Sequence, residues 1–227
     1  MSAPIIKAVI FDLDGVIIDS NPEIEKFWHR WAARENVALT DELVRMHIHG
    51  RKGTETIQVL FPHVTEATKQ AIRHAADALN NEINPAAITG VVSFIQFLRK
   101  QKITTGVVTS SHKSRMVQML QKHGLEQSFI SFVTAHDVTK GKPDPEPYRK
   151  MAEQLNLSPA QCLVFEDAVS GIRSAVAAGM HAIGIGNAAA EKGLLAEGAV
   201  LVIPDFTHLR LSETSLGLPN GFSFQWG

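Results

Sequence analysis

The stretch Val9-Ile-Phe-Asp12-Leu-Asp14-Gly15-Val16 places two carboxylates two residues apart, directly after a short apolar run. A nearly continuous apolar run is typical of a strand that is covered on both faces of a parallel sheet. Side chains at positions i and i+2 project to one side of a strand, about 6–7 Å apart, which leaves room for a phosphorus centre and a metal. Asp-x-Asp-Gly also occurs as a turn whose carboxylates satisfy backbone amides, so the stretch alone leaves both interpretations open.

Short β-branched apolar runs alternate with longer stretches of helical spacing through most of the chain. Because this alternation is typical of a parallel α/β sheet, we predict a Rossmann-like, doubly wound α/β core. Ligands bind such a sheet at the carboxyl ends of its strands, where Asp12 and Asp14 would lie. The predicted strands are Ile5–Phe11, Thr104–Thr109, Phe129–Thr134, Cys162–Phe165, Ala182–Ile185 and Val200–Ile203, and the predicted helices are Val91–Lys100, His112–His123, Pro145–Asn156 and Ser170–Ala178.

The segment from Val16 to Ala86 breaks the alternation, because it holds several amphipathic helical patterns and no convincing strand. Ser20 or Asn21 can cap the first of these helices. We therefore predict an inserted, all-helical cap domain at residues 16–86 and a catalytic core built from residues 1–15 and 87–227. The other cap helices are expected over Asp41–His47, Thr54–Leu60 and Thr65–Asn81.

The overall composition leaves a small molecule or a neutral protein as the default partner. The chain has 22 Lys+Arg against 23 Asp+Glu, so no global charge favours nucleic acid or an anionic membrane. No run approaches the roughly 20 apolar residues that cross a bilayer. Cys162 is the single cysteine and lies in an apolar run, which indicates a reduced thiol and a cytoplasmic location. A monomer and a homodimer both fit these observations.

Polar residues follow three further predicted strands. Thr109-Ser110-Ser111 ends one strand before a helix, where hydroxyls and helix-start amides can hold phosphate oxygens, although such a run alone is more often an N-cap. Lys142 lies between Gly141 and Pro143 just before a helix, and a loop lysine is normally solvated. Glu166-Asp167 ends another strand, and acidic caps explain many such pairs. Together these residues supply a nucleophile, a proton carrier, metal ligands, a hydroxyl and a cation, the set that phosphoryl transfer needs.

In this order, and with a helical insert after the first, Asp12-Leu-Asp14-Gly15, Thr109, Lys142 and Glu166-Asp167 resemble the four motifs of the haloacid dehalogenase superfamily. The resemblance covers essentially the whole chain. Finer features are similar to the branch that contains glycerol-phosphate and sugar-phosphate phosphatases and β-phosphoglucomutase. These features are Phe27-Trp28, His49-Gly50-Arg51, Lys140-Gly-Lys-Pro143, Glu146-Pro-Tyr148 and Phe165-Glu-Asp-Ala168.

The resemblance implies a Mg²⁺-dependent phosphatase that forms an aspartyl-phosphate on Asp12. It implies that Asp14 protonates the departing alkoxide and later deprotonates the attacking water. Magnesium would be bound by the Asp12 carboxylate, the Asp14 backbone carbonyl and Asp167, with Glu166 assisting directly or through water. By the same resemblance, phosphate oxygens would be held by Thr109, the Ser110 amide and Lys142.

The loop that joins two predicted cap helices is our candidate for substrate selection. Gly50 can approach a ligand closely, while Arg51 and Lys52 offer cations. A polar surface turn is the alternative interpretation of the same residues. Elsewhere in the chain, the histidines His112 and His136 carry no pairing signal.

Hydrolysis of a small sugar or polyol phosphate is the favoured function. A phosphomutase of the β-phosphoglucomutase type is the alternative, although Gly50 is followed by Arg-Lys-Gly-Thr and not by that family's Val-Ser-Arg-Glu. A dehalogenase is disfavoured because the second carboxylate, Asp14, would be unnecessary there. A dinucleotide site at Gly184-Ile-Gly186 is disfavoured because the third glycine is absent. The tail Leu211–Gly227 fits an added edge hairpin or a dimer contact.

Overall fold

A computed structural model describes residues 3–227 and contains a six-stranded parallel sheet. The strand order is β4-β3-β2-β5-β6-β7, so β2, which leads into the two predicted acids, lies near the middle. The predicted parallel α/β core is confirmed, with strand ends shifted by one or two residues. The strands are β2 Ala8–Phe11, β3 Thr104–Val108, β4 Ser131–Val133, β5 Cys162–Glu166, β6 His181–Ile185 and β7 Leu201–Ile203.

Helices cover both faces of this sheet, and alternate residues of β2 are buried on opposite faces. Val9 and Phe11 join the hydrophobic cluster on one face, whereas Ala8 and Ile10 join the cluster on the other. Because both sets are buried, the strand reads as a continuous apolar run in the sequence. The flanking helices are α5 Val91–Lys100, α6 Lys113–Lys122, α7 Glu146–Leu155, α8 Val169–Ala177 and α9 Ala188–Ala196.

Helix α9 was not among the predicted helices. The glycine-rich stretch before it and Gly193 within it obscure the helical spacing. A local signal exists, because the Asn187 side chain accepts hydrogen bonds from the backbone N–H groups of Ala189 and Ala190. An asparagine before an alanine run is therefore the feature that marks this helix start.

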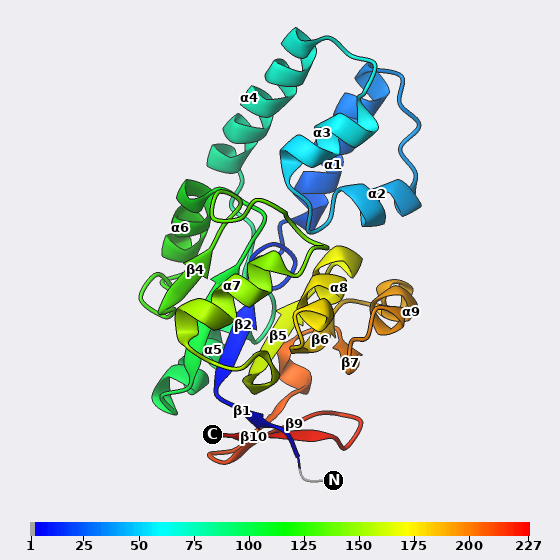
Figure 1. Cartoon of the computed structure of the whole chain (residues 1–227). Helices are drawn as coiled ribbons and strands as arrows, with labels where there is room; N and C mark the ends of the chain where they lie inside the picture. The colour runs from blue at the N-terminus through cyan, green and yellow to red at the C-terminus, as the bar shows by residue number, and fades with distance from the viewer. Residues whose placement is uncertain (1–2) are drawn as a thin grey trace.

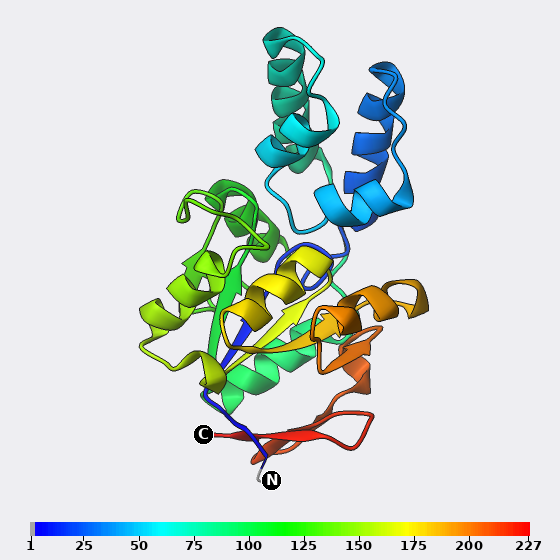
Figure 2. The same ribbon diagram turned by 45° about the vertical axis from the view of Figure 1, so that its right-hand side comes forward.

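Four helices stand together over the carboxyl ends of the core strands (Figures 1 and 2). They enclose a hydrophobic cluster of their own, which includes Phe27, Trp28 and Phe61. The predicted all-helical cap is thus confirmed as a fold, while its limits 16–86 stay a prediction. Val16, Ile17 and Ile18 pack in a cluster beneath the sheet. The cap helices are α1 Asn21–Arg34, α2 Asp41–His47, α3 Gly53–Leu60 and α4 Glu66–Glu82.

The predicted strand Ile5–Phe11 was wrong as a single element. It divides at the exposed Lys7, whose backbone N–H donates to the carbonyl of Gln161 at 2.8 Å. Ile5 and Ile6 form β1, which pairs in parallel with the last strand of a separate four-stranded sheet. That sheet lies at the end of the molecule opposite the cap (Figure 1). Its other strands are β8 Arg210–Leu211, β9 Ser215–Gly217 and β10 Ser223–Trp226.

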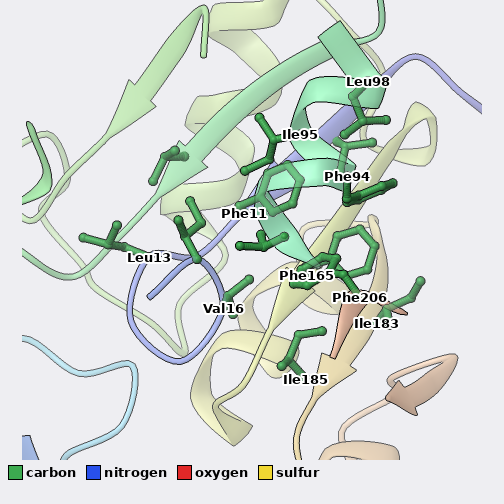
Figure 3. Close-up of a cluster of buried hydrophobic side chains, with 14 of the residues drawn as sticks. Phe11, Leu13, Val16, Phe94, Ile95, Leu98, Phe165, Ile183, Ile185 and Phe206 are labelled. Atoms are coloured by element: carbon green, nitrogen blue, oxygen red, sulfur yellow. The ribbon is translucent and has the colours of Figure 1, made fainter. Parts of the chain in front are cut away.

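A set of aromatic rings fixes the middle of the core directly below the strand ends (Figure 3). Phe11 precedes Asp12, Phe165 precedes Glu166, and the two rings stack with centroids 5.6 Å apart. Phe94 from α5 and Phe206 pack on the same pair. The tips of β2 and β5 are therefore joined by backbone pairing and by ring stacking. None of the helices within residues 3–227 is long and apolar enough to cross a membrane.

Candidate active site

The turn after β2 brings Asp12 and Asp14 to the carboxyl edge of the sheet. The Asp12 N–H donates to the Phe165 carbonyl at 3.0 Å, which continues the pairing of β2 with β5. Gly15 then turns the chain with φ 73°, and a Cβ atom there would lie 2.1 Å from Asp167 Oδ2. Glycine is needed at this position both for its backbone conformation and for the close approach of Asp167.

Lys142 lies beneath Asp12 and is almost fully buried. Its Nζ is 3.0 Å from Asp12 Oδ1, donates to the Val108 carbonyl at 3.1 Å, and donates to Glu166 Oε1. Burial opposes the charge on Lys142, but the two carboxylates outweigh burial and raise its pKa above the ordinary value. The side chain is therefore a fixed cation, as phosphate binding requires.

Glu166 holds Lys142 in place. Its Oε1 accepts hydrogen bonds from Lys142 Nζ and from the Tyr148 hydroxyl, the latter at 2.9 Å, and its Oε2 accepts from the Ala168 N–H at 3.2 Å. A Cβ at Gly171 would lie 1.9 Å from the Glu166 carboxyl group, so α8 can approach only because a glycine stands there. Tyr148 was not predicted to act at the site, since only its contact with Glu166 brings it there.

The oxygens of Asp12, Glu166 and Asp167 could together hold a metal ion, because one from each lies within 4.8 Å of the others. Oδ1 of Asp167 is shielded from solvent and accepts no hydrogen bond from any described residue, whereas the equally shielded Oδ1 of Asp12 has Lys142 Nζ as its neighbour at 3.0 Å. Burial raises the pKa of Asp12 to about 7 and that of Asp167 well above its usual range. A buried oxygen without a donor fits a hard divalent cation such as Mg²⁺. The predicted ligands Asp12, Asp167 and Glu166 are thus brought together, while the Asp14 carboxylate lies outside this group.

Asp14 has quite different neighbours. Arg115 donates to both of its oxygens, from Nη2 to Oδ1 at 2.6 Å and from Nη1 to Oδ2 at 2.7 Å. Ser20 Oγ donates to Oδ1, and Ser111 Oγ donates to Oδ2 at 3.0 Å. Burial alone would raise the pKa of Asp14, but Arg115 and the hydroxyls lower it below the ordinary value. In this arrangement Asp14 is a carboxylate whose oxygens are fully engaged.

Two of these donors, Ser20 and Arg115, were not assigned to the site from the sequence, and Ser111 was expected there only as part of a hydroxyl run that holds phosphate. Ser20 was read as a helix cap, but at the N-cap position of α1 its hydroxyl makes no cap hydrogen bond and turns to Asp14. Ser111 and Arg115 are four residues apart at the start of α6, and residues spaced this way share a helix face. A cation four residues after a strand-end serine was the signal that could have identified Arg115.

The predicted phosphate ligands Thr109 and Ser110 follow β3 on the other side of Asp12. Thr109 is buried, and its Oγ1 accepts a hydrogen bond from the Ser111 N–H at 3.1 Å. Both residues line a cavity of about 90 Å³ together with Asp12 and Asp14. The structure thus places the hydroxyl run beside the two acids.

The cap loop lies directly against the core. Gly50 has φ 69°, and a Cβ there would be 2.6 Å from Ser170 Oγ. Its carbonyl accepts from Ser110 Oγ at 2.7 Å, and Arg51 Nη1 donates to the Lys142 carbonyl at 2.5 Å. Lys52 Nζ donates to the Val138 carbonyl at 3.0 Å. These three candidate selection residues therefore join the cap to the core in a closed arrangement.

A larger chamber of about 520 Å³ opens between cap and core beside the small cavity. Its core side carries Ser111, Arg115 and two histidines, His112 and His136, whose ring nitrogens are 2.6 Å apart. These histidines come from loops after β3 and β4, so their pairing was not visible in the sequence. The cap side combines apolar and aromatic residues with polar ones. The apolar residues are Ile24, Phe27, Trp28, Ile57 and Leu79, and the polar residues include Arg73, Asp77 and Asn80.

Known proteins are similar to this chain in sequence and in fold. The family model described as haloacid dehalogenase-like hydrolase matches residues 9–185. Hexitol phosphatase A of Escherichia coli is 34% identical over 84% of this chain and 88% of its own length. The beta-phosphoglucomutase of Bacillus subtilis is 29% identical over 90% of this chain and 92% of its own. A crystal structure of a family IA hydrolase from Entamoeba histolytica superposes with a TM-score of 0.77 at 27% identity, covering 92% of this chain and 97% of that one.

Proposed function

Because the chain belongs to the haloacid dehalogenase-like hydrolases, we propose that it is a Mg²⁺-dependent phosphatase that hydrolyses a small sugar or polyol phosphate through an aspartyl-phosphate. One observation carries the proposal. Asp12 directly follows a central strand, and its carboxylate is buried between the fixed cation Lys142 and the carboxylate of Asp167. A nucleophilic carboxylate in phosphoryl transfer needs these neighbours.

In the first step an Asp12 carboxylate oxygen attacks phosphorus and forms the new P–O bond. The bond between phosphorus and the sugar oxygen breaks, and the alkoxide takes a proton from Asp14. Asp14 must gain this proton from solvent beforehand, because Arg115 holds it as a carboxylate while the chamber is empty. Lys142 and the Thr109 hydroxyl lie beside Asp12 and would hold the equatorial oxygens of the phosphoryl group as negative charge builds up. The free alcohol then leaves the chamber.

In the second step water attacks the phosphorus of the aspartyl-phosphate. Asp14, now a carboxylate, takes the proton from the water as the bond between phosphorus and Asp12 breaks. Inorganic phosphate leaves, and Asp14 is protonated again for the next substrate. Splitting one difficult displacement into two in this way is the advantage of a covalent intermediate.

Magnesium would be held by the carboxylates of Asp12 and Asp167, and we propose that the Asp14 backbone carbonyl completes the protein ligands. Glu166 is already engaged by Lys142, Tyr148 and the Ala168 N–H, so we assign it mainly to the positioning of Lys142. When bound, the metal would neutralise charge on the phosphate oxygens. Two observations support this assignment: Asp167 Oδ1 is buried and accepts no hydrogen bond from the described residues, and oxygens of Asp12 and Asp167 lie within 4.8 Å of each other.

The chamber supports a hydroxylated leaving group. Sugars and polyols carry C–H groups, which suit the apolar and aromatic residues of the cap side. Their hydroxyls suit the paired histidines of the core side and the cap residues Arg73, Asp77 and Asn80. The related hexitol phosphatase agrees with this class. A mutase is the second candidate, because a beta-phosphoglucomutase is similar over nine-tenths of this chain.

The test is a panel of hexitol, hexose and nucleotide monophosphates, assayed for released inorganic phosphate with Mg²⁺ and with excess chelator. We expect Mg²⁺-dependent release from hexitol or hexose phosphates. Isomeric sugar phosphate in place of free phosphate would establish the mutase. Release that is unchanged by chelator would contradict the metal assignment, and no release from any substrate would contradict the proposal as a whole.

A further inference from the structure

The Asp14 carboxylate has no acceptor site left for a reacting group. A carboxylate offers about four lone-pair sites, and Asp14 receives four hydrogen bonds from Arg115, Ser20 and Ser111. The reaction proposed above requires Asp14 to exchange protons with the leaving alcohol and with water. At least one of these four donors must therefore move before Asp14 can act.

Arg115 is the donor whose position suggests how this release occurs. Its side chain is only 6% exposed, and its guanidinium makes two of the four hydrogen bonds to Asp14. The same residue lines the 520 Å³ chamber in which the alcohol portion of a substrate would lie. Arg115 thus contacts both the proton carrier and the space that the leaving group would fill.

We propose that Arg115 is a positioning residue that restrains Asp14 until a hydroxylated leaving group occupies the chamber. The inference rests on the proposed function. Hydroxyl oxygens of the bound alcohol accept hydrogen bonds from the guanidinium in place of Asp14. The freed carboxylate takes up a proton from solvent and turns to the reacting oxygen, to which it gives that proton. Arginine suits this exchange because its five N–H donors can serve two partners in turn. Occupation of the chamber is thereby coupled to the readiness of Asp14.

The alternative is a permanent ion pair that only neutralises a buried charge. The two readings differ for a substrate that is too small to fill the chamber. Acetyl phosphate is such a substrate, and its acetate leaving group departs without taking a proton. Phosphorylation of Asp12 then needs no proton from Asp14, whereas hydrolysis of the aspartyl-phosphate still needs Asp14 as the base. Restraint by Arg115 would make that second step slow while the chamber is empty.

The first experiment uses the wild-type protein with acetyl phosphate and Mg²⁺. The added ligand is a deoxy analogue of the best substrate's alcohol that lacks the hydroxyl able to accept the phosphoryl group, so transfer to it is impossible. We expect the analogue to raise acetyl phosphate turnover roughly tenfold, the effect of releasing about one hydrogen bond, and to lower the acid-trapped phosphoenzyme. No acceleration, or simple competitive inhibition, would overturn the inference.

The second experiment compares Arg115→Met with Arg115→Lys, and uses Lys113→Met on the same helix as the matched control. Lys113 is exposed and does not line the chamber. Arg115→Met should raise turnover of acetyl phosphate alone, abolish activation by the analogue, and lower kcat/KM for the sugar phosphate. Arg115→Lys should restore part of the activation. If Arg115 had a purely structural role, Arg115→Met would lower the activity toward acetyl phosphate and toward the sugar phosphate together. That result would refute restraint of Asp14.

Circular dichroism and the thermal midpoint check that the variants fold. Ser111→Ala offers a milder variant should Arg115→Met fail to fold, because Ser111 bonds both Asp14 and Arg115. It should raise acetyl phosphate turnover in the same direction by a smaller factor, and a decrease would count against the inference. Failure of the proposed function is distinguishable, since no phosphoenzyme would then form from acetyl phosphate at all.

Discussion

Asp12 and Asp14 are two residues apart on the same turn, yet their surroundings are opposite. Asp12 pairs with Lys142, whose Nζ is 3.0 Å from its Oδ1, and burial raises the pKa of Asp12 to about 7. Asp14 receives four hydrogen bonds, and Arg115 lowers its pKa despite burial. Two identical side chains thus acquire different chemistry from their neighbours alone. Asp12, which lies beside a fixed cation, suits attack on phosphorus, and Asp14, which four hydrogen bonds hold, suits controlled movement of a proton.

Asp12→Asn should have the largest effect in the molecule. The amide cannot form an aspartyl-phosphate, so we expect kcat to fall at least roughly 10⁴-fold for every substrate. Phosphate release and acid-stable incorporation of labelled phosphate measure this loss, and circular dichroism checks the fold. Turnover near the wild-type rate would show that Asp12 is not the nucleophile.

Asp14→Asn should distinguish the role of Asp14 from that of Asp12, because its effect should depend on whether the leaving group needs a proton. For sugar phosphates we expect a loss of roughly 10²–10⁴-fold, the usual contribution of general acid–base catalysis. Phosphorylation of Asp12 by acetyl phosphate needs no proton from Asp14, so the labelled phosphoenzyme should accumulate in this variant. Rapid-quench measurement of the phosphoenzyme tests this. An equal loss of phosphorylation from both substrates would remove the distinction between the acids.

Lys142→Met tests how much the ion pair between Lys142 and Glu166, beside Asp12, contributes to the stability of the fold. The substitution leaves Glu166 charged, buried and without its main partner, so we expect a loss of about 3–5 kcal/mol in the free energy of unfolding. Urea denaturation measures it. The double variant Lys142→Met with Glu166→Gln should recover part of that loss. A single variant as stable as the wild type would mean that Glu166 takes up a proton or a new partner at little cost.

Gly50→Ala should act on both acids equally, through the cap. Its φ of 69° and the 2.6 Å approach to Ser170 Oγ oppose a side chain, so the closed arrangement should weaken. We expect KM for the sugar phosphate to rise roughly tenfold, with little change in the thermal midpoint. Gly53→Ala is the control, since a Cβ there meets nothing within 4 Å. Equal effects of both substitutions would exclude contact at Gly50 as the cause.

The smallest effects should come from removing one hydrogen bond near Asp12 or one hydrogen bond to Asp14. Tyr148→Phe removes a donor to Glu166, and Ser20→Ala removes a donor to Asp14. Each should cost about 1 kcal/mol of stability, measured by urea denaturation. Only Ser20→Ala should increase turnover of acetyl phosphate, because it alone loosens Asp14. An increase in acetyl phosphate turnover in Tyr148→Phe would contradict the assignment of this effect to Asp14.

Sequence reasoning reached the parts of the site that lie at strand ends. Asp12, Lys142 and Asp167 follow recognisable strands or precede helices, and the parallel sheet brings such ends together. It did not find Arg115, because the contact with Asp14 spans 101 residues and depends on a side-chain direction. The division of the first strand at Lys7 was missed for a similar reason. Its cause is the pairing of β1 with β10 at the far end of the chain.

The stacked rings of Phe11 and Phe165 sit one residue before the nucleophile and one residue before the acidic pair. A shift of either ring would therefore alter the spacing of Asp12 and Asp167, although neither ring meets a substrate. The packing of the hydrophobic core thus sets the distance between two polar groups of the site, the carboxylates of Asp12 and Asp167. Laboratory evolution for faster turnover should accordingly find useful variants among residues such as Phe94 and Phe206, which brace this pair from the side.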